Sequence, residues 1–380
     1  MGNKKVGKTF PSDICVNHNQ LPRILTLNYM ARVPTNIISP VGWGKTQSTH
    51  QFHAMLNTKL KKPIKKYMFF TGLIDATDVG GFPTVHIDTS HFPKDKKGVE
   101  YVMLDLLPFD REEDCIIVYD EIDRCREEVL NACTQLLLGG EIHGHKLSSG
   151  AYSVMTMNGT SDIYTMTLPE AIRNRICSIY IDPNMVNSMD SWVKWATANG
   201  IDDRIIGYMQ FSPGDVKRET SYEELALCTP RSMEMLSRVV KAASLAQFKT
   251  DDIMYPITAG IAGSATAKKY ASYTDIFMHM PDLNKLLDDP DSVDWEKFKM
   301  RDKKFAIATF IIHNVQGRDQ AAKALGVLDK YMPQEIAEWG IRSIATRIDE
   351  VISTPEYMAI RKKMKEKIKT PIPIEKAETL

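Results

Sequence analysis

The chain has 380 residues, of which 43% are hydrophobic and 25% are charged. This composition is ordinary for a globular protein with two or three packed units. Its 48 basic residues balance its 48 acidic residues, so no overall field attracts nucleic acid or an anionic membrane, and any such partner must be met locally.

The six cysteines are scattered and form no C-x-x-C pair, which is typical of reduced thiols in a cytosolic compartment. No apolar run approaches the roughly 20 residues needed to cross a bilayer, and the N-terminus lacks the apolar core of a signal peptide. We therefore expect a soluble cytoplasmic protein, located in the host cytoplasm if it is viral.

The first recognisable unit follows an N-terminal segment over residues 1–34. A short apolar strand is expected over 35–39 and a helix over 46–60, where apolar residues recur at helical spacing. The residues between them match the phosphate-binding pattern G-x-x-x-x-G-K-[ST], which requires a strand before it and a helix after it. This loop reads Ser39-Pro40-Val41-Gly42-Trp43-Gly44-Lys45-Thr46.

The chemistry of this loop points to a nucleotide. Its glycine-rich turn frees backbone N–H groups to point at phosphates, Lys45 can reach the β and γ oxygens, and the Thr46 hydroxyl can coordinate Mg²⁺. Ser39 replaces the first glycine of the pattern. Because a small residue is sufficient at a strand exit, we expect Ser39 to alter nucleotide affinity rather than abolish binding.

Further strand-like runs alternate with helical segments up to residue 182. They are short, apolar and rich in β-branched or aromatic residues, which indicates a parallel sheet covered by helices on both faces. These runs cover residues 66–73, 115–119, 152–157 and 176–181. The predicted fold class is therefore α/β, with ligands bound at the carboxyl ends of the strands, where the phosphate loop lies.

Two adjacent carboxylates, Asp120 and Glu121, follow the strand over 115–119. At that position Asp120 can hold Mg²⁺ through water, and Glu121 can orient or deprotonate a water that attacks a γ-phosphate. The alternative is an acidic helix start without a catalytic role, since Asp and Glu favour the first helical turn. The phosphate loop some 75 residues earlier favours the catalytic interpretation.

After Asp182-Pro183 the pattern becomes helical. Apolar residues three and four apart predict helices over 188–199, 202–211, 231–247, 253–264, 305–314 and 335–352. A lysine-rich segment and a proline-containing loop close the chain. Residues 266–380 match no motif that indicates a function.

The order and spacing of these motifs resemble the AAA+ ATPases, and within them the MoxR-like group together with related phage-encoded ATPases. The resemblance covers about residues 35–265. The family's G-P-P-G-x-G-K-T loop is matched at Pro40, Gly42, Gly44, Lys45 and Thr46, its Walker B segment at 120–124, and its L-P-E-A-x-x-x-R segment at 168–175.

The resemblance implies roles for three further residues. Asn158, after the strand over 152–157, corresponds to sensor 1, although Asn158-Gly159 is also a common turn. Arg175 corresponds to the arginine finger that acts on the neighbouring subunit's nucleotide, with Arg173 as a second candidate and a surface salt bridge as the alternative. Arg231 corresponds to sensor 2 on the lid, unless it is structural.

Two family inserts are also expected. Residues 75–83 contain adjacent glycines that suit a tight, exposed loop, and residues 141–147 are similar to the hairpin that precedes sensor 1. In a ring, these segments can face the pore and grip a partner. His143 and His145 suggest a metal site, but no cysteine or carboxylate set accompanies them at ligand spacing.

The resemblance implies the domains and the activity. We expect a P-loop AAA+ nucleotide-binding domain over 35–185, an all-helical lid over 186–265 and a helical C-terminal extension over 266–380. The expected activity is ATP hydrolysis with ATP and Mg²⁺, in a homo-oligomeric ring, by family analogy a hexamer, that remodels or chaperones a protein partner. The alternatives are a nucleic-acid motor or loader on the same fold and a nucleotide-dependent scaffold that does not hydrolyse.

Overall fold

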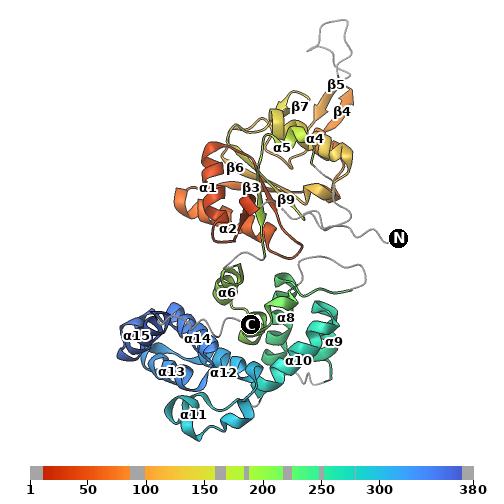
Figure 1. The fold of residues 1–380 in the computed structure, drawn as a ribbon. Helices are drawn as coiled ribbons and strands as arrows, with labels where there is room; N and C mark the ends of the chain where they lie inside the picture. Colours follow the sequence, from red (N-terminus) through yellow and green to blue (C-terminus); the bar gives the residue numbers. More distant parts are fainter. Residues whose placement is uncertain are drawn as a thin grey trace, which may run out of the picture. The chain divides into compact units, whose positions relative to one another are not determined.

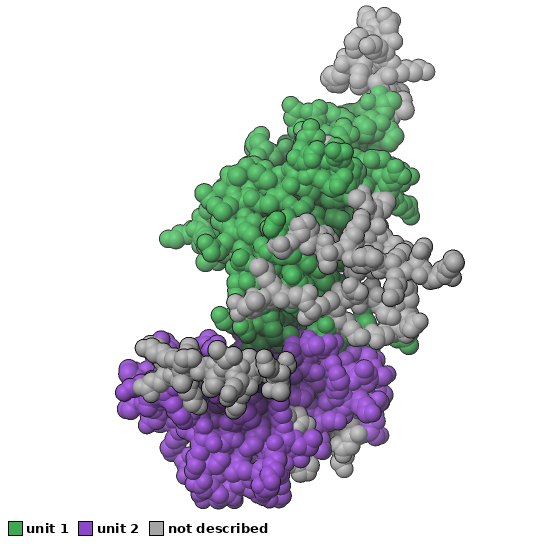
Figure 2. All heavy atoms as spheres, in the orientation of Figure 1, with its two compact units in different colours: residues 1–195, 216–233 green, residues 196–215, 234–380 purple. Residues whose placement is uncertain are grey.

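The computed structural model describes residues 12–85, 99–158, 168–183, 188–216, 225–247, 252–278 and 280–369. The chain divides into two compact units, each formed from two stretches of sequence (Figure 2). The first unit consists of Met1–Trp195 and Val216–Met233, and the second of Ala196–Asp215 and Glu234–Leu380. No described helix is both long enough and apolar enough to span a membrane.

A six-stranded sheet forms the centre of the first unit (Figure 1). It is fully parallel, and its strand order is β1-β10-β2-β9-β6-β3. Its strands are β1 (Cys15–Val16), β2 (Thr35–Ile38), β3 (Lys65–Phe70), β6 (Cys115–Asp120), β9 (Ala151–Met157) and β10 (Cys177–Ile181). The predicted α/β class and its parallel sheet are confirmed. The two-residue strand β1, at the edge beside β10, was not predicted.

Helices cover both faces of the sheet. One hydrophobic cluster contains residues of α1 (Leu21–Ala31) and α2 (Lys45–Leu60), and the other contains residues of α3 (Ala76–Gly80), α4 (Glu127–Gly139) and α5 (Glu170–Arg173). Helix α6 (Ser188–Ala198) follows β10 in the chain and continues into the second unit. Short 3₁₀ turns lie at Ser12–Ile14, Thr71–Leu73 and Ile122–Arg124.

Strand β6 shows why the sheet is buried on both sides. All six of its residues are buried, and successive side chains of a strand point to opposite faces. Ile116 and Val118 belong to the hydrophobic cluster that contains Phe52 of α2. Ile117 and Tyr119 belong to the cluster that contains Leu130 of α4. A continuous apolar run is therefore needed here, and an alternating strand would bury polar groups on one face.

The order of the strands places the phosphate loop at a switch point of the sheet. After β2 the chain crosses to β3 at the sheet edge, returns through β6 to β9 beside β2, and then passes to β10 on the other side of β2. The connections therefore leave β2 in opposite directions. Such a switch point opens a crevice beyond the carboxyl ends of the strands, where ligands of parallel sheets bind.

Two antiparallel ribbons extend from this unit: β4 (Phe82–Val85) with β5 (Val99–Val102), and β7 (Glu141–Ile142) with β8 (His145–Lys146). The hairpin expected over 141–147 is present. The loop expected over 75–83 is instead the short helix α3 followed by β4. Asp75 caps α3 through a capping box, so local side-chain hydrogen bonds satisfy the helix start that the adjacent glycines concealed.

The second unit is helical. It contains α7 (Asp203–Phe211), the greater part of α8 (Pro230–Leu245), α9 (Met254–Ala262), α10 (Ser264–Met278), α11 (Leu283–Asp288), α12 (Arg301–Asn314), α13 (Gly317–Tyr331), α14 (Gln334–Arg347) and α15 (Pro355–Lys369). Its 3₁₀ turns cover Pro213–Asp215, Pro290–Ser292, Trp295–Phe298 and Asp349–Ser353. The predicted helix over 335–352 therefore ends earlier, at Arg347.

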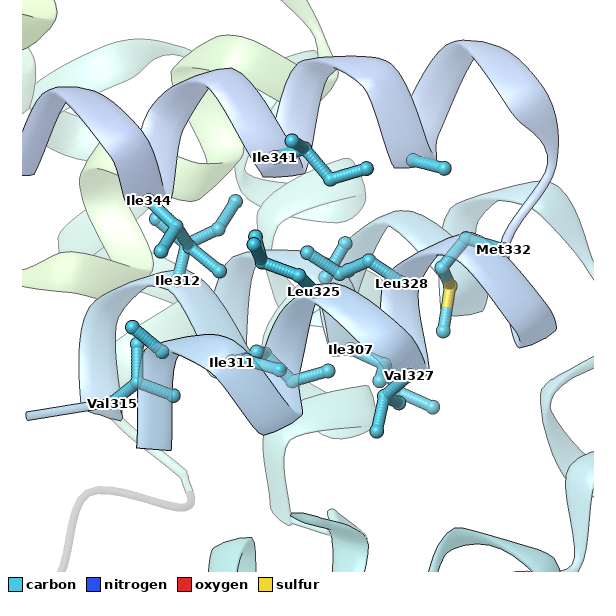
Figure 3. Packing of buried hydrophobic residues seen from close by; sticks show 14 of the residues in the cluster. Ile307, Ile311, Ile312, Val315, Leu325, Val327, Leu328, Met332, Ile341 and Ile344 are labelled. Atoms are coloured by element: carbon cyan, nitrogen blue, oxygen red, sulfur yellow. The ribbon is translucent and has the colours of Figure 1, made fainter. Parts of the chain in front are cut away.

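The core of the second unit lies between α12, α13 and α14 (Figure 3). Ile307 and Ile311 of α12, Leu325 and Leu328 of α13, and Ile341 and Ile344 of α14 are buried. Within each helix these residues are three or four positions apart, which places them on one face. The helical periodicity of the sequence therefore identifies the residues that pack together.

The two ribbons of the first unit are joined by histidines. The His143 ring stacks on Tyr101 with the ring centroids 3.8 Å apart. His145 Nδ1 lies 2.6 Å from Asp110 Oδ2, and its Nε2 lies 3.0 Å from the Tyr101 carbonyl oxygen. Only the protonated imidazole can donate to both acceptors. The hydrogen bond to Asp110 accordingly raises the pKa of His145 and lowers that of Asp110.

We predict that Asp110→Asn lowers the pKa of His145 toward its ordinary value of about 6.5. Asparagine tolerates the positive φ of 51° at this position, so the backbone should be preserved. The pKa of His145 is raised in the folded protein, so its contribution to stability is present below the unfolded pKa and is lost as the pH rises through the folded pKa. NMR titration of the His145 ring measures this shift.

The exposed Asp105, which pairs with Arg111, provides a matched control. Asp105→Asn should leave the titration of His145 unchanged. An identical His145 titration in wild type and in Asp110→Asn would show that the carboxylate does not support the imidazolium.

Candidate functional site

The phosphate loop connects β2 to α2 at the carboxyl edge of the sheet. Gly42 and Gly44 both have φ of 79°, a conformation that favours glycine. Ser39 is not among the residues with positive φ, and its amide donates to the Met157 carbonyl oxygen at 3.2 Å. Serine therefore fits at the first position of the pattern because the backbone there does not require glycine.

Lys45 is the buried cation of the site, with only 7% of its surface exposed. Its Nζ donates to the carbonyl oxygens of Ser39 (3.0 Å) and Pro40 (3.2 Å) and to Asn158 Oδ1 (2.8 Å). Burial lowers the pKa of Lys45 to about 8, although nearby carboxylates, Asp123 foremost, counteract this shift. The ammonium is therefore held by neutral oxygens in a place where an anion would stabilise its charge.

Asp120 ends β6 beside the hydroxyls of two threonines. Thr46 Oγ1 lies 3.0 and 3.2 Å from the two carboxylate oxygens of Asp120, and Thr156 Oγ1 donates to Oδ1 at 2.6 Å. Thr46 lies in the first turn of α2 and Thr156 lies in β9, so three elements meet at this carboxylate. The oxygen donors of Thr46 and Asp120 are of the type that Mg²⁺ prefers.

Glu121 and Asn158 lie side by side at the exits of β6 and β9. Glu121 has φ of 53°, its amide donates to Thr156 Oγ1 at 2.9 Å, and its side chain is 43% exposed. Asn158 is 2% exposed, and its Nδ2 lies 3.4 Å from Glu121 Oε1. Glu121 Oε2 is also 3.5 Å from Arg124 Nη1. The Glu121 carboxylate thus lies between the Asn158 amide and the Arg124 guanidinium.

The structure adds polar residues that the sequence interpretation did not select. Thr156 contacts both Asp120 and the amide of Glu121, and Thr71 Oγ1 donates to the Asp120 carbonyl oxygen at 2.8 Å. Asp123 is completely buried, and its Oδ2 accepts the Asn158 amide at 2.9 Å. A polar residue near the end of the strand over 152–157 is a weak sequence signal that does not by itself identify Thr156.

The start of α8 lies against the phosphate loop. The Arg231 amide donates to the Gly42 carbonyl oxygen at 3.3 Å. Thr229 caps α8, since its Oγ1 accepts from the Ser232 amide at 3.1 Å. A Cβ built on Gly42 would lie 2.7 Å from this Oγ1. The Arg231 side chain is exposed, and its charge lowers the pKa of Lys45, which places Arg231 near the site.

Arg175 is not brought together with the other candidates. It precedes β10, which begins at Cys177 opposite Thr35 of β2, so Arg175 lies at the amino edge of the sheet. The phosphate loop lies at the carboxyl edge, and a five-residue strand such as β10 separates these edges by about 16 Å. Arg173 and Arg175 are both exposed, and neither guanidinium forms an ion pair with a described residue. Arg175 therefore does not reach the site of its own chain.

The histidines of the β7–β8 hairpin contact an aromatic ring, a carboxylate and a backbone carbonyl of the same unit. His143 stacks on Tyr101 and His145 contacts Asp110 and the Tyr101 carbonyl. Among the described residues, no group of three or more His, Cys, Asp or Glu side chains is arranged to hold a metal ion. The Thr46 and Asp120 pair remains the candidate for a cation held largely by water and substrate.

No protein-family model and no curated protein matches this sequence. Among solved structures, the chain is similar to a RuvB mutant of Thermotoga maritima, with 13% identity over 72% of this chain and 77% of that chain and a TM-score of 0.39. It is also similar to a putative ATPase of Cytophaga hutchinsonii ATCC 33406 (14% identity, 66% and 82% coverage, TM-score 0.32). NtrX of Brucella abortus in complex with ATP gives 12% identity, 90% and 69% coverage and a TM-score of 0.38. Likenesses at these TM-scores carry no argument about this chain.

We predict that Gly42→Ala destabilises the protein more than Gly44→Ala. Both glycines have φ of 79°, and a left-handed conformation costs alanine about 1–2 kcal/mol. Only the Gly42 substitution also creates a close contact, with the buried and hydrogen-bonded Thr229, which adds about 1–3 kcal/mol. Urea unfolding of the two variants measures the difference in the free energy of unfolding.

Gly139, near the end of α4, serves as the unstrained control, because a Cβ there meets no atom within 4 Å and its φ is not positive. Gly139→Ala should be neutral or stabilising by up to about 1 kcal/mol. Equal losses for Gly42→Ala and Gly44→Ala would contradict a close approach of Thr229 to the loop.

Proposed function

We propose that this chain is an ATP-binding and ATP-hydrolysing protein of the AAA+ class. One observation carries the proposal: Lys45, Thr46, Asp120, Glu121 and Asn158 come from three separate segments of the sequence and belong to one hydrogen-bonded group, in which Thr156 links Asp120 to Glu121. They surround a glycine-rich loop at the switch point of a parallel sheet, and sites of this kind bind phosphates. The motif order further supports a MoxR-like member of the class.

The residues present fit MgATP. The loop from Pro40 to Thr46 supplies backbone N–H groups at the start of α2 and the ammonium of Lys45, all of which favour a polyphosphate. Thr46 and Asp120 supply the oxygen donors for Mg²⁺, Asp120 through water. A bound Mg²⁺ would neutralise phosphate charge and orient the terminal phosphate.

Glu121 is the residue that we assign to the attacking water. Its carboxylate is partly exposed beside Asn158, so it can accept a proton from water or orient it. Asn158 presents its amide between Lys45 and Glu121, which is where a sensor of the γ-phosphate would act. In the proposed hydrolysis, Glu121 positions the water, and Asn158 and Lys45 recognise the phosphate.

The proposal includes assembly into a ring. Arg175 lies at the opposite edge of the sheet from its own site, so it can serve a nucleotide only when supplied to a neighbouring subunit. A guanidinium in that role stabilises charge that develops on the phosphate. Arg231, on the helix that contacts Gly42, would contribute from the same subunit. We propose a homo-oligomer, by analogy with the family a hexamer.

The output that we propose is remodelling or chaperoning of a protein partner. The balance of 48 basic and 48 acidic residues supports a protein rather than nucleic acid as the substrate of remodelling, since nucleic-acid binding depends on positive charge. DNA or RNA that stimulates ATP turnover in a strongly salt-dependent manner would instead identify a nucleic-acid motor.

Replacing the water-positioning carboxylate separates binding from hydrolysis. We predict that Glu121→Gln binds ATP with an affinity close to that of wild type and loses turnover by at least about 100-fold, because the amide cannot accept the proton of water. Equilibrium binding of a fluorescent ATP analogue and phosphate release measure the two properties. Normal hydrolysis by Glu121→Gln would refute the assignment.

Two further variants calibrate this experiment. Lys45→Ala should abolish nucleotide binding, whereas Lys59→Ala, which changes an exposed lysine of the same helix, should not. Glu128→Gln changes an exposed carboxylate in the first turn of α4 and should leave turnover unchanged.

The arginine finger can be tested by mixing subunits. Arg175→Ala and Glu121→Gln should each be inactive alone, and a mixture should regain part of the wild-type turnover, because an interface can combine the intact Glu121 of one subunit with the intact Arg175 of the other. Phosphate release from defined mixtures measures this rescue. If mixed assemblies form, as checked by native mass spectrometry, and show no rescue, Arg175 does not act in trans. The same mixture with Arg173→Ala tests the second candidate.

A further inference from the structure

Asp123 is a buried carboxylate to which the proposed reaction has so far assigned no role. It lies in the 3₁₀ turn Ile122–Arg124, directly after the catalytic candidate Glu121. Its side chain has no exposed surface. Its Oδ2 accepts the Asn158 amide at 2.9 Å, and its Oδ1 is buried without a hydrogen-bond partner in the part of the chain that the structure describes. A carboxylate in this state is costly, so its presence requires a reason.

The Asp123 carboxylate acts on the backbone amide of Asn158. Asn158 follows the last residue of β9, and Met157 is the last β9 residue paired with β2. The amide of a buried residue that has left the sheet still needs an acceptor. Asp123 supplies that acceptor from the exit of the neighbouring strand β6, so this one hydrogen bond fixes the Asn158 backbone where the ladder ends.

Asn158 connects the other members of the site. Its Oδ1 accepts from Lys45 Nζ at 2.8 Å, and its Nδ2 lies 3.4 Å from Glu121 Oε1. A shift of the Asn158 backbone would therefore move both contacts together. The charge of Asp123 supports the same arrangement. Of the charged groups near Lys45, Asp123 raises the pKa of the Lys45 ammonium most, against the larger effect of burial. Burial raises the pKa of Asp123 to about 6, against the opposing effects of the Asn158 amide and Lys45.

We propose that Asp123 is a positioning residue for ATP hydrolysis: it anchors the Asn158 amide at the exit of β9 and thereby sets Asn158 between Lys45 and Glu121. This inference rests on the proposed ATPase function. The Asp123 side chain has no exposed surface, and its Oδ2 accepts from the Asn158 amide, so its effect on the reaction passes through Asn158.

The experiment compares Asp123→Ala with Asp123→Asn in the full-length protein. Removing the acceptor should lower kcat about 10- to 100-fold, the usual effect of losing an outer-shell partner, while the Kd for ATP changes by less than about threefold. Asparagine retains an acceptor oxygen for the Asn158 amide, so Asp123→Asn should restore kcat to within about threefold of wild type. Hydrogen exchange at the Asn158 amide should be faster in Asp123→Ala and close to wild type in Asp123→Asn.

Ser148 provides a matched control, because it is a buried polar residue at the other end of the same two strands. Its Oγ donates to the Glu113 carbonyl oxygen at 2.6 Å and accepts from the Glu113 amide at 3.0 Å. Ser148→Ala should reduce stability without a change in kcat or in exchange at Asn158. If Asp123→Ala and Ser148→Ala affect kcat equally at equal loss of stability, Asp123 has only a structural role and the proposal is overturned.

The amide measurement separates this inference from the proposed function. If the wild-type protein hydrolyses no ATP, the proposed function fails, and exchange at Asn158 still decides whether Asp123 anchors it. If wild type hydrolyses ATP and Asp123→Ala retains both its kcat and its protected Asn158 amide, the positioning role is refuted while the ATPase stands. If Asp123→Ala fails to fold, Asp123→Asn alone provides the test. The anchoring role would be refuted if Asp123→Asn kept the wild-type rate of exchange at the Asn158 amide but had a kcat more than tenfold below that of wild type.

Discussion

The burial of a single ammonium group organises this site. Lys45 is held by two loop carbonyls and the Asn158 side chain, and no carboxylate among the described residues contacts it directly. Transfer of such a charge out of water is unfavourable unless other charges compensate for it. Asp120, Glu121 and Asp123 all lie close enough to favour the charged form. The arrangement therefore combines one buried cation with several carboxylates, and it suits a ligand that brings both a divalent cation and phosphate anions.

A parallel sheet can build this arrangement because its strands all end at one edge. The phosphate loop follows β2, Asn158 follows β9, and Asp120 and Glu121 end β6, and these three strands are neighbours. Adjacent strands are about 4.8 Å apart, so residues more than a hundred positions apart in sequence come within hydrogen-bond distance. The same geometry places Arg175 at the far edge, since it precedes its strand. One rule of strand direction thus separates the residues proposed to act within a subunit from the one proposed to act between subunits.

Much of the fold follows from local patterns. The buried strands were predictable because their apolar runs are continuous, and the helices of the second unit because apolar residues recur at three and four positions. The prediction was wrong where short polar contacts decide the structure. Within residues 75–83, helix α3 forms over Ala76–Gly80 because Asp75 and Asp78 form a capping box at its start, and the glycines obscured that signal. Strand β1 has only two residues and exists through its pairing with β10, so no local pattern reveals it.

For the site, the sequence alone determined the residues whose chemistry is encoded in short motifs: the loop from Pro40 to Thr46, and the pair Asp120 and Glu121. Tertiary structure decided which distant groups complete them. Thr156 and Asp123 became visible only when β9 was placed beside β6, and Thr229 only when α8 met Gly42. The physical reason is that a short motif specifies the backbone conformation and side chains of residues that are adjacent in sequence. Hydrogen bonds between strand ends depend instead on the order in which the strands pack, which is a property of the whole unit.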